Sequence, residues 1–130
     1  MKPVRVLICD DSLGFPTLVE TWLRDDGRFE VVARASGGEQ AKEIVADLQP
    51  DVIMLDLLLP DVPDPKLLVS DLRTLHPSLR VLLVSSLQTE LLEEAGRQAR
   101  VDGVCHKGAT ASVLTDRLYA VVPDNHEANA

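Results

Sequence analysis

In the segment Val52-Ile53-Met54-Leu55-Asp56, four successive apolar residues are followed by a carboxylate. A strand exposed on one face alternates apolar and polar residues. Here successive positions are apolar, which is typical of a parallel strand covered on both faces. A carboxylate at the end of a buried strand is costly unless it has a partner, so Asp56 indicates a functional site.

Four further strands are predicted on either side of this one, and helical segments alternate with them. The expected strands are Val4–Cys9, Phe29–Ala35, Val52–Leu55, Arg80–Val84 and Val101–His106. The alternation predicts an α/β fold: a doubly wound five-stranded parallel sheet with helices on both faces. Right-handed crossovers then bring the carboxyl ends of all strands to one edge, where such folds bind ligands. The pattern alone leaves the strand order open.

Three helix starts carry recognisable signals. The segment Ser36-Gly37-Gly38-Glu39 has the spacing of a capping box, in which a serine hydroxyl and a glutamate satisfy backbone N–H groups. Asp64 precedes Pro65, which predicts an N-cap followed by the first helical residue. Thr110 is expected to cap the last helix, which runs to about Val121.

Composition and charge restrict the class of protein. The 130 residues fit one domain, expected over residues 1–122, with residues 123–130 as a polar disordered tail or the start of a linker. A net charge of −8 argues against direct binding to nucleic acid. No apolar run approaches the ~18 residues that cross a bilayer. Together with two cysteines expected to be buried and reduced, this predicts a soluble cytoplasmic protein.

Polar and charged residues follow four of the five predicted strands, so they converge on the carboxyl edge of the sheet. They are Asp10 and Asp11, Asp56, Ser85 and Ser86, and Lys107. Three neighbouring carboxylates oppose one another's ionisation, and a divalent cation such as Mg²⁺ relieves this repulsion. Aspartate can also attack phosphorus. The set therefore predicts metal-assisted phosphoryl transfer to a carboxylate.

The same residues lie in motifs that extend over residues 4 to about 122. The motifs are Val6–Ser12, Pro50–Asp56 with Pro60, Val81–Ser86, and Val101–Gly103 with Lys107 four residues beyond. In these motifs the chain resembles the receiver domain of two-component response regulators. The resemblance implies a flavodoxin-like fold of the chemotaxis-receiver type, with strand order 2-1-3-4-5. It also implies that Cys9 and Cys105 lie too far apart to form a disulfide.

The resemblance assigns roles to the acidic residues. Asp56 would be the phosphoacceptor. Asp11 would bind Mg²⁺ directly, Asp10 would bind it largely through water, and the backbone carbonyl of Leu58 would be a further ligand. The phosphodonor would be a sensor histidine kinase or a phosphotransfer protein.

The resemblance also assigns roles on the two later strands. Ser85 would hydrogen-bond the phosphoryl group and move toward it on activation. The backbone N–H of Ser86 would hold a phosphoryl oxygen, and Lys107 would pair with the phosphate. The changed interaction surface would act on a second copy in a homodimer, or on a C-terminal output domain outside this chain; the sequence leaves both open.

Several positions depart from the pattern of this family. The switch aromatic, usually found three residues before the lysine, is replaced by Val104. The proline that usually follows the lysine is replaced by Gly108. Leu58 and Leu87 stand where polar residues often admit attacking water, which suggests slow dephosphorylation. His106 is interpreted as structural, because the site is complete without it.

The sequence leaves two alternatives to a phosphorylated receiver. The missing aromatic favours a pseudo-receiver, a docking module whose output does not depend on phosphate, while the complete acidic pocket argues against it. A phosphatase of the aspartyl-phosphate type would need a second acid at position 58, which is leucine. We therefore expect no enzymatic activity beyond self-phosphorylation and autodephosphorylation.

Overall fold

The computed structural model describes residues 2–123, over which five strands and five helices alternate. Residues 124–130 of the expected tail lie outside this range. The elements are β1 (Val4–Cys9), α1 (Phe15–Asp26), β2 (Phe29–Ala35), α2 (Gly38–Leu48), β3 (Val52–Asp56), α3 (Pro65–Leu75), β4 (Arg80–Ser85), α4 (Thr89–Ala99), β5 (Gly103–His106) and α5 (Ala111–Val121). Among the described residues, no helix is long and apolar enough to span a bilayer.

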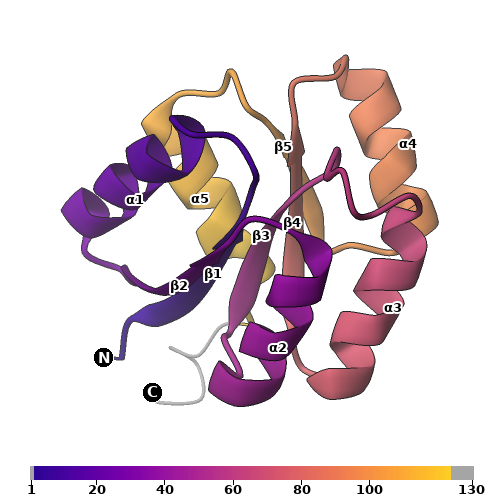
Figure 1. Cartoon of the computed structure of the whole chain (residues 1–130). Helices are drawn as coiled ribbons and strands as arrows, with labels where there is room; N and C mark the ends of the chain where they lie inside the picture. The colour runs from indigo at the N-terminus through magenta and orange to yellow at the C-terminus, as the bar shows by residue number, and fades with distance from the viewer. Residues whose placement is uncertain (1, 124–130) are drawn as a thin grey trace.

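The strands form one parallel sheet in the order β2-β1-β3-β4-β5, as Figure 1 shows. The expected order is therefore confirmed. β5 begins two residues later than expected because the Asp102 side chain takes part in the pairing there. Its carboxylate accepts the N–H of Val81 at 2.7 Å, so regular strand pairing starts only at Gly103.

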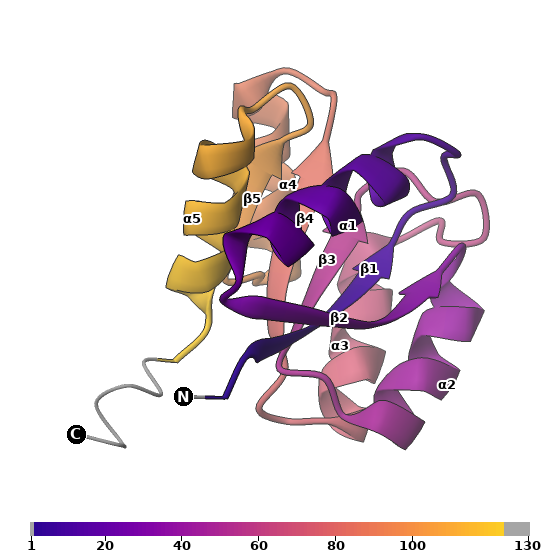
Figure 2. The ribbon, with the colours of Figure 1, turned by 90° about the vertical axis from the view of Figure 1, so that its left-hand side faces the viewer.

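Helices cover both faces of the sheet, as expected. α1 and α5 lie on one face, whereas α2, α3 and α4 lie on the other (Figures 1 and 2). Successive strand side chains point to opposite faces, so each strand contributes to two separate cores. Cys9 packs in the core under α2–α4, whereas Cys105 packs in the core under α1 and α5. Both are buried free thiols, as expected, and the structure places them on opposite sides of the sheet.

Two of the three predicted helix caps are present. The Asp64 carboxylate accepts the N–H of Lys66 at 3.0 Å, with Pro65 as the first helical residue. The Thr110 hydroxyl accepts the N–H of Val113 at 3.3 Å. Both caps are made by a residue next to the helix, which is why the sequence revealed them.

The capping box predicted at Ser36 is wrong. The Ser36 hydroxyl and N–H bond to the side chain of Gln40 instead. The first N–H groups of α2 are taken by Asp61, from the loop between β3 and α3: Gly38 donates at 3.0 Å and Glu39 at 3.2 Å. A carboxylate offers two acceptor oxygens and a negative charge to the positive end of the helix dipole.

Two glycines allow this loop to approach α2. A Cβ on Gly37 would lie 2.9 Å from Oδ2 of Asp61, and a Cβ on Gly38 would lie 2.6 Å from Cγ2 of Val62. Both distances are shorter than van der Waals contact. The Gly37-Gly38 pair therefore fixes the β3–α3 loop, which follows directly after Asp56, against α2.

Candidate functional site

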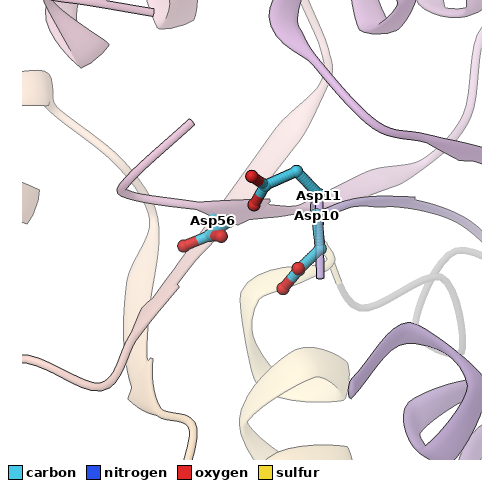
Figure 3. A group of neighbouring side chains, drawn as sticks. All are labelled: Asp10, Asp11 and Asp56. Atoms are coloured by element: carbon cyan, nitrogen blue, oxygen red, sulfur yellow. The ribbon is translucent and has the colours of Figure 1, made fainter. Parts of the chain in front are cut away.

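The acidic residues meet because β1 and β3 are neighbours in the sheet. Cys9 pairs with Leu55, so the next residue of each strand, Asp10 and Asp56, lies at the same edge. Oxygens from Asp10, Asp11 and Asp56 all lie within 4.8 Å of one another. Figure 3 shows the three carboxylates at these strand ends. The structure thus brings together the three acidic residues that the sequence predicts at one site.

Asp10 is buried and holds the loop that follows β1. Its Oδ1 accepts the N–H of Ser12 at 2.7 Å and the hydroxyl of Ser12 at 2.6 Å. Its Oδ2 lies 2.8 Å from Nζ of Lys107. Burial acts to raise the pKa of Asp10, but Lys107 and the donors of Ser12 outweigh it and lower that pKa. Asp10 is therefore held as an anion.

Asp56 is also buried but is less well compensated. Its Oδ1 accepts the N–H of Leu58 at 3.2 Å, and its Oδ2 lies 3.3 Å from Nζ of Lys107. Burial raises the pKa of Asp56, and the neighbouring Asp10 adds to the effect, whereas the Leu58 N–H and Lys107 only partly offset it. A desolvated carboxylate with few donors is well suited to act as a nucleophile once its charge is balanced.

Lys107 reaches both carboxylates from the end of β5. Its side chain is 19% exposed. Its ammonium also lies 5.0 Å from the centre of the Phe15 ring, within the range of a cation–π contact. Burial acts to lower the pKa of Lys107, but Asp10 and Asp56 outweigh it and raise that pKa. The lysine is therefore a fixed positive charge at the pocket.

The donor set suits a hard divalent cation. Oδ2 of Asp10 is buried, and among the described residues it has the ammonium of Lys107 beside it at 2.8 Å but no hydrogen bond of good geometry. A buried carboxylate oxygen without a hydrogen bond is the kind of atom that a metal ion satisfies. Asp11, exposed on the rim, offers a second carboxylate toward the same point.

Ser85 and Ser86 lie at the end of β4, beside Asp56. The N–H of Leu57 donates to the carbonyl of Val84 at 2.9 Å, which fixes the residue after Asp56 against this strand. Ser85 is buried, and its hydroxyl oxygen accepts the N–H of Leu87 at 3.1 Å. No acceptor for the hydroxyl proton of Ser85 is found within residues 2–123, so this proton can be donated to a bound group.

Two further predicted positions lie at the edges of the site. Leu58 lies two residues after Asp56 and is 59% exposed. Val104 lies on β5 against α4: a Cβ on Gly96 would come within 2.6 Å of Cγ1 of Val104. Val104 is thus faced by a glycine on the neighbouring helix.

Three contributors to the site were not found from the sequence. Ser12 holds Asp10, Phe15 contacts Lys107, and Asp61 fixes the loop after Asp56. The local signal for Ser12 was present, because a serine two residues after an aspartate often closes a turn on its carboxylate. Phe15 and Asp61 act on residues from other strands or helices, so no local pattern marks them.

Comparison with known proteins agrees with this geometry. The profile of the family described as the response regulator receiver domain matches residues 6–119. Among solved structures, the receiver domain of a NarL response regulator from Mycobacterium tuberculosis is similar at a TM-score of 0.80 and 28% identity, covering 93% of this chain and 98% of that chain. The chemotaxis protein CheY4 of Vibrio cholerae shares the fold at a TM-score of 0.80 and 24% identity, covering 93% and 100% of the two chains.

Curated relatives point to the same domain within longer proteins. A protein-glutamate methylesterase/protein-glutamine glutaminase of Myxococcus xanthus is 35% identical over 78% of this chain and 28% of its own length. One from Geobacillus kaustophilus is 37% identical over 99% of this chain and 38% of its own length. The chain thus spans well under half the length of these relatives.

The fold and the matched range together define a class, the signal receivers of two-component systems. This chain belongs to the response regulator receiver domain family, and it is a receiver domain of two-component signalling.

Proposed function

We propose that Asp56 accepts a phosphoryl group from the phosphohistidine of a sensor histidine kinase or a phosphotransfer protein. The observation that carries this proposal is the position of Asp56. It is a buried carboxylate with a raised pKa, within 4.8 Å of two other carboxylates and 3.3 Å from an ammonium. An isolated structural aspartate would not be expected to have these neighbours.

In the proposed reaction a carboxylate oxygen of Asp56 attacks the phosphorus atom. The bond between phosphorus and the donor nitrogen breaks, and its electron pair leaves with the imidazole of the donor. Lys107 balances the charge that accumulates on the phosphoryl oxygens, and the free hydroxyl proton of Ser85 and the backbone N–H of Ser86 bind them. The product is an acyl phosphate on Asp56.

Mg²⁺ would be held by the carboxylates of Asp10, Asp11 and Asp56 and by the backbone carbonyl of Leu58. It would neutralise negative charge on the carboxylates and the transferred group. The buried Oδ2 of Asp10, which among the described residues has only the ammonium of Lys107 beside it, supports this assignment. The buried free thiols of Cys9 and Cys105 suit the reducing cytoplasm, in which we propose that the chain acts.

The pseudo-receiver alternative is not favoured, because the acidic pocket and its lysine are complete. The chemistry proposed for this chain is limited to its own phosphorylation and dephosphorylation. The methylesterase and glutaminase names of the curated relatives belong to proteins of which this chain covers 28% and 38% in the two cases above.

Amide NMR distinguishes a phosphorylated receiver from a pseudo-receiver. Mg²⁺ alone should shift the signals of Asp10, Asp11 and Asp56. Adding beryllofluoride, which mimics a phosphoryl group on aspartate, should then shift Ser85 and α4. An Asp56→Asn variant should lose the second response. A wild-type protein that binds Mg²⁺ but shows no change at Ser85 and α4 on adding beryllofluoride would favour the pseudo-receiver.

A further inference from the structure

His106, the last residue of β5, links two loops that border the proposed phosphoryl site. Its Nδ1 accepts the N–H of Gly108 at 2.8 Å. Its Nε2 lies 3.2 Å from the backbone carbonyl of Ser86. The ring thus joins the loop that follows β5 to the loop that follows β4.

These two contacts determine which ring nitrogen carries the proton. A ring nitrogen that accepts an N–H must be unprotonated, so the single proton of the neutral ring lies on Nε2. A carbonyl oxygen can only accept a hydrogen bond, so Nε2–H donates to Ser86. The two hydrogen bonds therefore require the same tautomer of His106.

The contact with Gly108 depends on a departure from the family pattern. Proline usually stands at this position, and proline has no backbone N–H to donate. A side chain at position 108 would also crowd the ring, because a Cβ there would lie 3.0 Å from Nδ1 of His106. His106 and Gly108 therefore act together: the glycine supplies both the donor and the space.

The linked loops carry the groups proposed to bind the phosphoryl oxygens. Ser85 pairs with His106 in the sheet, and the N–H of Lys107 donates to the carbonyl of Ser85 at 2.9 Å. These are the last backbone contacts between β4 and β5. The His106 ring extends the connection by one residue, to the exposed Ser86.

We propose that His106 is a positioning residue: by holding the carbonyl of Ser86 it restricts the backbone of this residue, so that the N–H of Ser86 and the side chain of Lys107 face the same phosphoryl group. This inference rests on the proposed phosphorylation of Asp56. The ring itself contacts no reacting atom. Its effect comes from the order it imposes on Ser86, whose N–H must point into the site when the phosphoryl group binds.

Two substitutions separate the two hydrogen bonds. His106→Gln keeps an N–H at the distance of Nε2, so it can still donate to the Ser86 carbonyl. His106→Asn keeps an acceptor at the distance of Nδ1 for the Gly108 N–H but does not reach Ser86. A Gly108→Pro variant removes the donor to Nδ1 and leaves the histidine free to turn.

The test is a titration of the full chain with beryllofluoride at saturating Mg²⁺, followed by amide NMR. The His106→Asn variant should bind beryllofluoride about fivefold more weakly, as expected for loss of one ordering hydrogen bond. The His106→Gln variant should stay within about twofold of wild type. Gly108→Pro should fall between them, and the dissociation constant of Mg²⁺ alone should be unchanged in all three.

Equal beryllofluoride affinity in His106→Asn and wild type would overturn the positioning role, as would equal losses in the Asn and Gln variants. If the wild type itself gave no beryllofluoride response, the phosphorylation proposal would fail, and this inference would fail with it. The ring nitrogens of the wild type offer a check that does not depend on any variant. Their ¹⁵N shifts should show a proton on Nε2, and a proton on Nδ1 would contradict the proposal.

Discussion

Nζ of Lys107 lies 2.8 Å from Oδ2 of Asp10, nearer than to the proposed phosphoacceptor Asp56, from which it is 3.3 Å. Without phosphate, the lysine thus mainly compensates the buried carboxylate that follows β1. In the part of the chain that the structure describes, Oδ2 of Asp10 has no partner other than this ammonium. Lys107 and a metal ion would therefore satisfy the same atom, which couples the stability of the fold to the contents of the site.

Replacing Lys107 with methionine should lower the free energy of unfolding by about 3 kcal/mol at neutral pH, because Asp10 would be left buried and unpaired. Lys107 lowers the pKa of Asp10 in the folded protein. The stabilisation is therefore fully present above the pKa that Asp10 has in the unfolded chain, and it is lost as the pH falls through the lower pKa of the folded state. In urea unfolding, the difference in unfolding free energy between wild type and Lys107→Met should be large at pH 7 and should shrink in acid. At pH 7, Mg²⁺ should restore part of the stability that the variant has lost.

The exposed Lys66 on α3 provides the control, and its replacement by methionine should change the unfolding free energy little. A Lys107→Met loss that stayed constant into strong acid would show that packing, and not the charge on Asp10, is the cause.

The cap that Asp61 provides to α2 should be measurable as stability. Asp61→Ala should cost about 1 kcal/mol, because the N–H groups of Gly38 and Glu39 lose their acceptor. These N–H groups lower the pKa of Asp61, so the stabilisation holds above the usual value of 3.8 and disappears as the pH falls through the lowered pKa. The thermal unfolding temperatures of wild type and Asp61→Ala should therefore converge in acid.

Asp25→Ala is the matched control, since Asp25 is an exposed acid on α1. Equal effects of the Asp25 and Asp61 substitutions at neutral pH would argue against the cap.

The contact between Gly96 on α4 and Val104 on β5 should make Gly96→Ala destabilising. The new Cβ would lie 2.6 Å from Val104 and 3.1 Å from Val101, and overpacking of this kind costs about 1–3 kcal/mol. Adding Val104→Ala should recover much of the loss, because it removes the crowded methyl group. The measurement is a double-mutant cycle of unfolding free energies.

Gly14→Ala serves as the comparison, because nothing lies within 4 Å of a Cβ at that glycine. Strictly additive effects of Gly96→Ala and Val104→Ala would mean that the two positions do not constrain each other.

The leucine at position 58 should slow loss of the phosphoryl group from Asp56. Its side chain is 59% exposed next to the site and cannot orient water. Leu87 is half-buried and packs against the core under α2–α4, so its influence should be smaller. Decay of the acyl phosphate should be faster in Leu58→Asn, Leu87→Glu by a factor on the order of ten.

The same decay in Leu67→Asn, at a residue that is 65% exposed on α3, should match wild type. A wild-type protein that lost phosphate as fast as the double variant would rule out this role for the two leucines.

The fold and the acidic site were predictable because their signals are local. Each strand is a short apolar run, and a carboxylate, a hydroxyl or a lysine follows four of the five strands directly. Parallel topology then brings these residues together, as it does Asp10 and Asp56. The caps at Asp64 and Thr110 were found for the same reason.

What the sequence did not reveal depends on residues far apart in the chain. Asp61 replaced the cap predicted at Ser36 because it reaches α2 from a position 23 residues beyond Gly38. The ring of His106 contacts the carbonyl of Ser86, 20 residues earlier, and accepts the N–H of Gly108. The positioning role proposed for it depends on both contacts. A pattern along one segment carries no information about such partners.

The proposed function requires that Asp56 carry the phosphoryl group. The most direct test is to incubate the full chain with Mg²⁺ and a small phosphodonor such as acetyl phosphate, and to locate the modification by mass spectrometry of the peptides. We predict one added phosphoryl group on the peptide that contains Asp56. It should not form when Mg²⁺ is chelated before the donor is added, and it should be absent from Asp56→Asn. Phosphorylation that persists in Asp56→Asn, or that falls on another residue in the wild type, would contradict the account.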